Sequence, residues 1–169
     1  MNLRDTILAE HSRAQTDKIV KWVGNRQDRF DELFKLFSSD EYRVVQRAAW
    51  PLIYAAIAHP RLIQKHLTSL IRNLRKPGLH EAVKRNSVRI LQQITVPAKL
   101  RGELMNTCFD YITDPVEKPA IKAFSLTVLH NLSIQCPDIK QELKLVIETQ
   151  WQHESAAFRS RAKKIMNEL

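Results

Sequence analysis

One sequence pattern recurs about every 38 residues, and it constrains the fold of this chain more than any other feature. In the second half of each repeat, apolar residues return at equivalent positions with spacings of 38, 38 and 37 residues. These apolar columns are Val45, Val83, Ile121 and Phe158; Leu52, Ile90, Val128 and Ile165; Ile53, Leu91, Leu129 and Met166; and Ala56, Ile94, Leu132 and Leu169. Within a repeat the apolar positions follow helical periodicity, and no segment alternates as a strand does. The pattern predicts an all-α chain of repeated helical units.

The first half of each repeat carries a second set of apolar columns. They are Phe30, Leu67, Met105 and Leu143; Leu33, Leu70, Cys108 and Val146; Phe34, Ile71, Phe109 and Ile147; and Phe37, Leu74, Ile112 and Gln150. A column of small residues in the second helix, which we expect to let the two helices of a pair approach closely, holds Ala49, Ser87, Ser125 and Ala162. A helix pair with two apolar faces cannot bury both alone, so neighbouring pairs must stack.

Proline, glycine and other breakers separate helices of about 10–18 residues, about ten in all, and set the repeat boundaries. We predict a single domain over 1–169, with a helix pair in 1–25 and repeats at 26–59, 60–96, 97–136 and 137–169. Pro51 lies inside the segment 41–58, where it predicts a kink or break near 45–48.

The second helix of the first full repeat reads Arg47-Ala48-Ala49 followed by Leu52-Ile53. A small residue followed by an apolar pair is typical of the second helix in HEAT/armadillo α-solenoids. The chain resembles this family, strongly over residues 26–169 and more weakly over 1–25. The resemblance implies an α-α superhelix of about four and a half helix pairs with a concave binding face. A resemblance at the level of the fold implies a binding module but does not identify its ligand.

The positive charge of the chain is concentrated in one repeat. The chain has 27 lysines and arginines against 18 aspartates and glutamates, for a formal net charge of +9. Residues 61–101 alone hold ten basic residues and one acidic residue, Glu81. A positive charge that served only solubility would be spread more evenly along the chain. Its concentration in one repeat, which we call the basic belt, therefore favours binding of an anionic partner as the explanation.

Positions opposite the core columns of the second helices are expected to line the concave face. Gln46, Lys84, Lys122 and Arg159 would there form a row with three cations, one per repeat. The candidate residues for binding a partner or an anion are Arg47, Trp50, Tyr54, Arg72, Arg75, Lys76, Lys84, Arg85, Arg89 and Lys122. Trp50 and Tyr54 could stack on bases. Two alternatives stay open: the charges form an ordinary solvated face, and the aromatic pair simply covers the neighbouring helix.

No group of residues in the sequence has the spacing of a catalytic or metal site. The glycines are too far apart for a phosphate-binding loop, and the six histidines are scattered without a partner at helical spacing. Cys108 occupies a core column, so we expect a buried thiol rather than a nucleophile. We therefore predict no metal, no cofactor and no enzymatic activity.

Three functions compete on this basis. The first is a non-enzymatic module that binds a protein or peptide along its concave face. The second is nucleic-acid binding through the basic belt. The third follows from a similarity to helical-repeat proteins that excise alkylated bases from DNA; the nearest catalytic cluster would be Trp50 and Tyr54 with Asp40 or Glu41.

The remaining expectations concern location and assembly. The first residues are charged where a secretory signal needs an apolar core. The longest apolar run, residues 48–58, is shorter than the roughly 20 residues of a membrane span. Cys108 and Cys136 do not form a disulfide or metal motif. We expect a cytoplasmic protein, with no membrane association, that is a monomer or a weak dimer.

Overall fold

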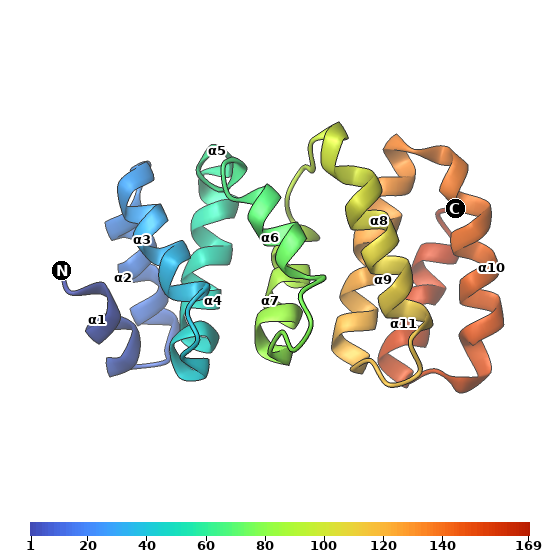
Figure 1. Cartoon of the computed structure of the whole chain (residues 1–169), viewed down its shortest axis with the longest axis horizontal. Coiled ribbons are helices and arrows are strands. Elements are labelled where there is room, and N and C mark those ends of the chain that lie inside the picture. Colours follow the sequence, from blue (N-terminus) through green and yellow to red (C-terminus); the bar gives the residue numbers. More distant parts are fainter. The chain divides into compact units, whose positions relative to one another are not determined.

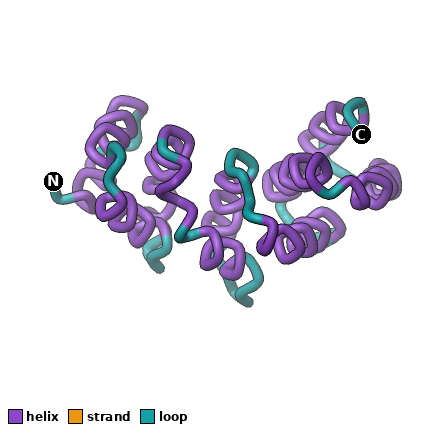
Figure 2. Tube along the Cα trace, turned by 90° about the horizontal axis from the view of Figure 1, so that it is seen from above, coloured by secondary structure: helices purple, strands orange, loops and turns teal.

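The computed structural model describes all 169 residues, and helices joined by short links are its only regular elements (Figures 1 and 2). The α-helices are α1 Leu3–Ala9, α2 Arg13–Val23, α3 Gln27–Phe37, α4 Tyr42–Ala58, α5 Pro60–Gln64, α6 Leu67–Asn73, α7 Glu81–Leu91, α8 Ala98–Thr113, α9 Pro119–Gln135, α10 Lys140–Gln150 and α11 Ala156–Met166. Two short 3₁₀ helices, η1 Pro137–Ile139 and η2 Trp151–His153, flank α10. The predicted all-α fold class is confirmed. None of the helices combines the length and the apolar character that crossing a bilayer requires.

The helices form two compact units, Met1–Asn86 and Ser87–Leu169, with the division inside α7. In the first unit α4 is the central helix and packs against α1, α2, α3 and α5. It can do so because its apolar residues are not confined to one stripe. Its buried residues are Val44, Val45, Ala48, Ala49, Pro51, Leu52, Ile53, Ala55 and Ala56. The alanines among them let neighbouring helices come close on more than one side.

Helix α4 continues without interruption through Pro51, which is buried. Of the kink or break predicted near 45–48, the break is therefore wrong. Proline removes one backbone hydrogen bond, to the carbonyl of Arg47, and disfavours the helical conformation of the residue before it. The packing of α4 on several sides outweighs this local cost, because most of the stability of a helix in a protein comes from its tertiary contacts.

In the second unit α9 has the central place and packs against α8 and α11 (Figure 1). Its fully buried residues include four members of the columns, Ile121, Ser125, Val128 and Leu129. In both units the column registers agree with the burial pattern, because none of the residues assigned to a column is exposed. The register that apolar periodicity predicts is thus the register of the core.

The segment between His59 and Leu74, at the start of the repeat 60–96, contains a break that the apolar columns do not indicate. It forms two shorter helices, α5 of 5 residues and α6 of 7, separated by a turn at Lys65 and His66. Asp31 of α3 holds this turn: its carboxylate oxygens lie 2.5 Å from Lys65 Nζ and 2.7 Å from His66 Nε2. Gln27, one turn before Asp31, donates to the carbonyl of Leu62 at 2.9 Å. Polar contacts from α3 therefore fix the break.

The imidazole of His66 also stacks on Phe34, with the ring centroids 4.0 Å apart. Partial burial of Asp31 acts to raise its pKa, but the bonds from Lys65, Gln27 and His66 outweigh burial and leave the pKa below its ordinary value. The carboxylate is thus stabilised in its charged form. A group with a lowered pKa stabilises the fold above its unfolded-state pKa, and this contribution is lost as the pH falls through the folded-state pKa.

We predict that Leu129→Ala lowers the free energy of unfolding by about 2–5 kcal/mol, because it leaves a cavity around a fully buried column residue. Leu145→Ala is the matched control, since this leucine on α10 is 64% exposed, and it should change stability by less than about 0.5 kcal/mol. Urea unfolding followed by circular dichroism measures both. Equal effects of the two substitutions would contradict the assigned register.

A second prediction concerns the turn at Lys65 and His66. At pH 7 Asp31→Asn should destabilise the chain by about 1 kcal/mol, a value discounted because the carboxylate is partly exposed. The difference from the unsubstituted chain should shrink as the pH falls from about 5 through the lowered pKa of Asp31. Glu32→Gln, an exposed neighbour on the same helix, is the control. A difference that does not change between pH 7 and pH 3 would rule out a charge-dependent turn.

Candidate functional site

The aromatic pair on α4 is in contact with residues from the start of the chain. The ring of His11 lies 5.0 Å from the ring of Trp50, measured between centroids. The guanidinium of Arg13 lies over Tyr54, 4.5 Å from its ring centroid. Both aromatic side chains are half-buried. This arrangement matches the alternative in which the pair covers its neighbours, since one face of each ring is already in contact with the chain itself.

Arg47, on the same helix, is half-buried, and its guanidinium donates a hydrogen bond to the carbonyl of Leu8. This carbonyl lies in the last turn of α1, where helical carbonyls lack an intrahelical partner. Arg47 therefore acts as a cap between elements of the first unit. Its charge is used inside the unit, although the sequence suggested a cation facing a partner.

Glu41, a candidate of the base-excision hypothesis, is engaged elsewhere. Its carboxylate accepts a bond of 2.6 Å from the guanidinium of Arg4, and both side chains are exposed. Asp40 is exposed in the link between α3 and α4. The acidic residues are thus found on an exposed link and in a surface ion pair, an arrangement that offers no enclosed acid beside the aromatic rings.

The basic residues of the 61–101 segment differ in their exposure. Arg72 in α6, and Arg75 and Lys76 just after it, are exposed, and we call these three residues the basic turn. Lys84 and Arg85, on α7 in the same unit, are half-buried. Arg89, which belongs to the second unit, is half-buried as well. The basic turn therefore offers the most accessible charge among the candidates.

Lys122, like Arg47, is a candidate cation that the structure places differently from the sequence expectation. Its side chain is 4% exposed and forms an ion pair with Glu154, whose side chain is 7% exposed. Because α9 is covered by both α8 and α11, a position that is outward-facing in an ordinary repeat is enclosed here. A buried ammonium requires a counter-charge, and Glu154 supplies it. The expected row of exposed cations therefore does not include Lys122.

The thiol of Cys108 is fully buried, as its core column predicted. Burial raises its pKa to about 12, with a smaller opposite effect from the hydroxyl of Ser125. A thiol with such a pKa is protonated at neutral pH and is a poor nucleophile. The structure also contains no cluster of three or more histidine, cysteine, aspartate or glutamate side chains that could hold a metal ion.

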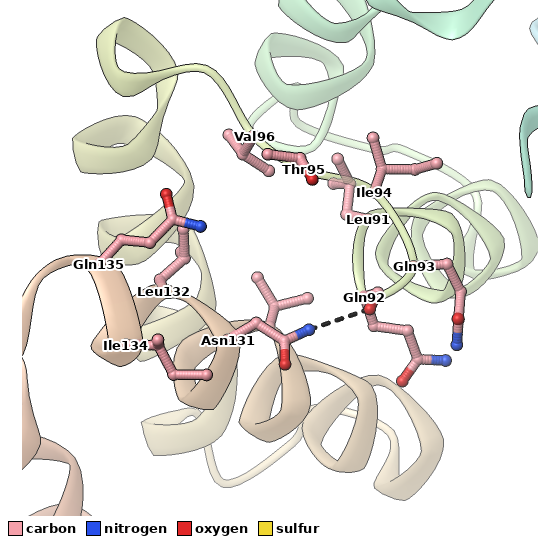
Figure 3. A pocket seen from close by; sticks show the side chains of 11 residues that line it. Leu91, Gln92, Gln93, Ile94, Thr95, Val96, Asn131, Leu132, Ile134 and Gln135 are labelled. Carbon is pink, nitrogen blue, oxygen red and sulfur yellow. Dashed lines mark hydrogen bonds between the residues drawn. The ribbon is translucent and has the colours of Figure 1, made fainter. Parts of the chain in front are cut away.

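A pocket of about 250 Å³ opens in the second unit, between the link that follows α7 and the last turns of α9 (Figure 3). Its floor consists of the buried apolar side chains Leu91, Val96, Val128 and Leu132. Amide side chains, among them Asn131 and Gln135, occupy its edge. Sequence reasoning missed this pocket because its residues have neither charge nor aromatic rings. The consecutive Gln92 and Gln93 at a helix end were the only local signal.

One known family of repeat proteins matches nearly the whole chain. A sequence model described as HEAT repeat domain matches residues 3–169. No curated protein and no solved structure matches the chain. HEAT repeats generally serve as protein-interaction scaffolds, and the family is typically non-enzymatic. The match spans nearly the whole length and agrees with the periodic columns, the all-α fold and the central packing of the second helices: the chain belongs to the HEAT repeat family.

Proposed function

We propose that this chain is a non-enzymatic interaction module that binds a protein or peptide partner. The observation that carries the proposal is that the rings of Trp50 and Tyr54 are in contact with other residues of the chain. Stacking on bases needs accessible ring faces, and one face of each ring is in contact with His11 or Arg13. The general role of HEAT repeats as interaction scaffolds supports the same conclusion. Following the family resemblance, we expect the partner to lie along the concave face of the repeats.

The basic turn is the surface that we propose for the charged part of this contact. Arg72, Arg75 and Lys76 lie within five consecutive residues, and all three are exposed. Exposed charges of one sign steer an oppositely charged partner and increase the association rate more than they increase the affinity of the final complex. An acidic segment of a protein is therefore the chemistry that complements the turn.

Nucleic-acid binding through residues 61–101 is the second candidate. The specific observation in its favour is the local charge, ten basic residues against one acidic residue. Phosphate backbones bind basic surfaces without any aromatic platform, and such binding depends steeply on salt concentration. The two candidates therefore differ in a measurable way.

Partner capture with the full chain tests the first candidate. We predict that the immobilised chain retains a protein from nuclease-treated lysate, and that Arg72→Glu, Arg75→Glu and Lys76→Glu together weaken binding of the purified partner at least tenfold. The control variant carries Lys18→Glu, Lys21→Glu and Lys35→Glu, which are exposed residues of the same unit and change the net charge equally. Thermal melting of each variant checks that it folds. Retention of no protein, or equal loss with the control variant, would count against the proposal.

Fluorescence anisotropy with single-stranded and duplex oligonucleotides tests the second candidate. If the module binds protein, no saturable binding should be observed at about 50 mM salt. Nucleic-acid binding through the three residues of the basic turn would instead lose affinity between about 50 and 200 mM salt, about 40-fold for duplex and about 20-fold for single strands, and would be abolished by the triple substitution in that turn. The control variant separates this effect from a general change in net charge.

A further inference from the structure

The pocket between the link after α7 and the end of α9 has a lining without any charged side chain. This is unusual in a chain in which 27% of the residues are charged. A charged ligand entering a pocket without a counter-charge loses its hydration and gains no ion pair. The lining therefore selects against phosphates and carboxylates, and favours a neutral ligand.

The edge of the pocket combines a fixed contact with free hydrogen-bonding groups. Asn131 of α9 donates from Nδ2 to the carbonyl of Gln92 at 2.9 Å, which joins the helix to the link (Figure 3). The side chains of Gln135 and Thr95 make no hydrogen bond within the chain, and both residues are exposed. In Figure 3 the amide of Gln135 extends from α9 toward the link that carries Thr95. An amide has both a donor and an acceptor, the same pair that a peptide unit presents.

The floor of the pocket is apolar and nearly closed to solvent, and the space above it suits one side chain of moderate size. Leu91 and Val128 are 1% exposed, Leu132 is 3% and Val96 is 4%. The volume of about 250 Å³ is below the roughly 300–1,000 Å³ of pockets that enclose whole small molecules. Ile134 lines the same pocket and is 67% exposed, so it adds apolar surface that a longer ligand could cover.

We propose that this pocket binds an extended, uncharged peptide segment of a protein partner, with one apolar side chain on the floor and its peptide groups bonded to Gln135 and Thr95. The proposal rests on the proposed function, since it assigns a peptide to an interaction module. It adds a second recognition surface whose chemistry differs from that of the basic turn, because the pocket would bind a neutral segment and the basic turn would bind an acidic one.

A displayed library of random 12-residue peptides, selected on the purified full chain, tests the proposal. Enriched peptides should share an apolar residue flanked by uncharged residues. A synthesised member of this group should shift the ¹H–¹⁵N signals of residues 91–96 and 128–135 in the labelled chain. Its dissociation constant should rise at least tenfold in the variant Ile134→Asp with Gln135→Glu, which places charge at the edge through two exposed positions and so spares the core.

The matched control is Leu145→Asp with Gln141→Glu, because Leu145 is 64% exposed and both residues lie on α10, away from the pocket lining. It should bind the peptide as the unsubstituted chain does. The proposed peptide site would be overturned if the two double variants bound the peptide with equal affinity, or if the signals shifted elsewhere in the chain. It would also be overturned if the enriched peptides were acidic and depended on the basic turn, or if no peptide was enriched. Tight binding of small neutral amides with no gain from a longer peptide would also overturn it.

These failures are distinguishable from a failure of the proposed function. If a captured protein partner binds the unsubstituted chain and the variant Ile134→Asp with Gln135→Glu equally well, the peptide site in the pocket is rejected and the proposed interaction function is not. Absence of any captured protein would instead remove the function itself.

Discussion

Burial of one helix on more than one side is the constraint on which each unit depends. In the first unit α4 packs against four other helices, and in the second α9 lies between α8 and α11. Neither helix has a single apolar stripe that one partner could cover, so neither is stable without neighbours on several sides. This demand explains why the column residues are enclosed, and why Pro51 is tolerated inside α4. It also explains why the polar groups on these helices need partners of their own.

The same enclosure decides the role of charged residues near the central helices. Lys122 lies on a helix that is covered from two directions, so its ammonium is paired with Glu154. Arg47 is half-buried on α4, and it bonds to the carbonyl of Leu8. Removing one member of a buried ion pair leaves the other charge uncompensated. Each of these contacts lies within one unit and stabilises its packing, whereas the three charged residues of the basic turn are exposed.

Sequence alone predicted the all-α fold, the register of the apolar columns and the burial of Cys108, because each depends on periodicity within a short segment. It did not predict contacts between side chains that are far apart in sequence. Asp31 and His66 are 35 residues apart, and their contact fixes a turn that the apolar columns do not signal. Lys122 and Glu154 are 32 residues apart, and only the fold places them together. The break that Pro51 predicted near 45–48 was wrong for a related reason, since the local preference of proline was weaker than the packing contacts around α4.

The pocket and the basic turn lie where the repeats differ from one another in sequence. Core columns recur in every repeat, so they cannot distinguish one repeat from another. The links differ: Gln92 and Gln93 follow α7, whereas Arg75 and Lys76 follow α6. A partner with an acidic segment and a neutral segment would use two chemically different contacts, and linked contacts increase affinity only when the spacing of the segments lets both bind at once. Selectivity would then depend on the spacing of two segments within the partner as much as on either segment.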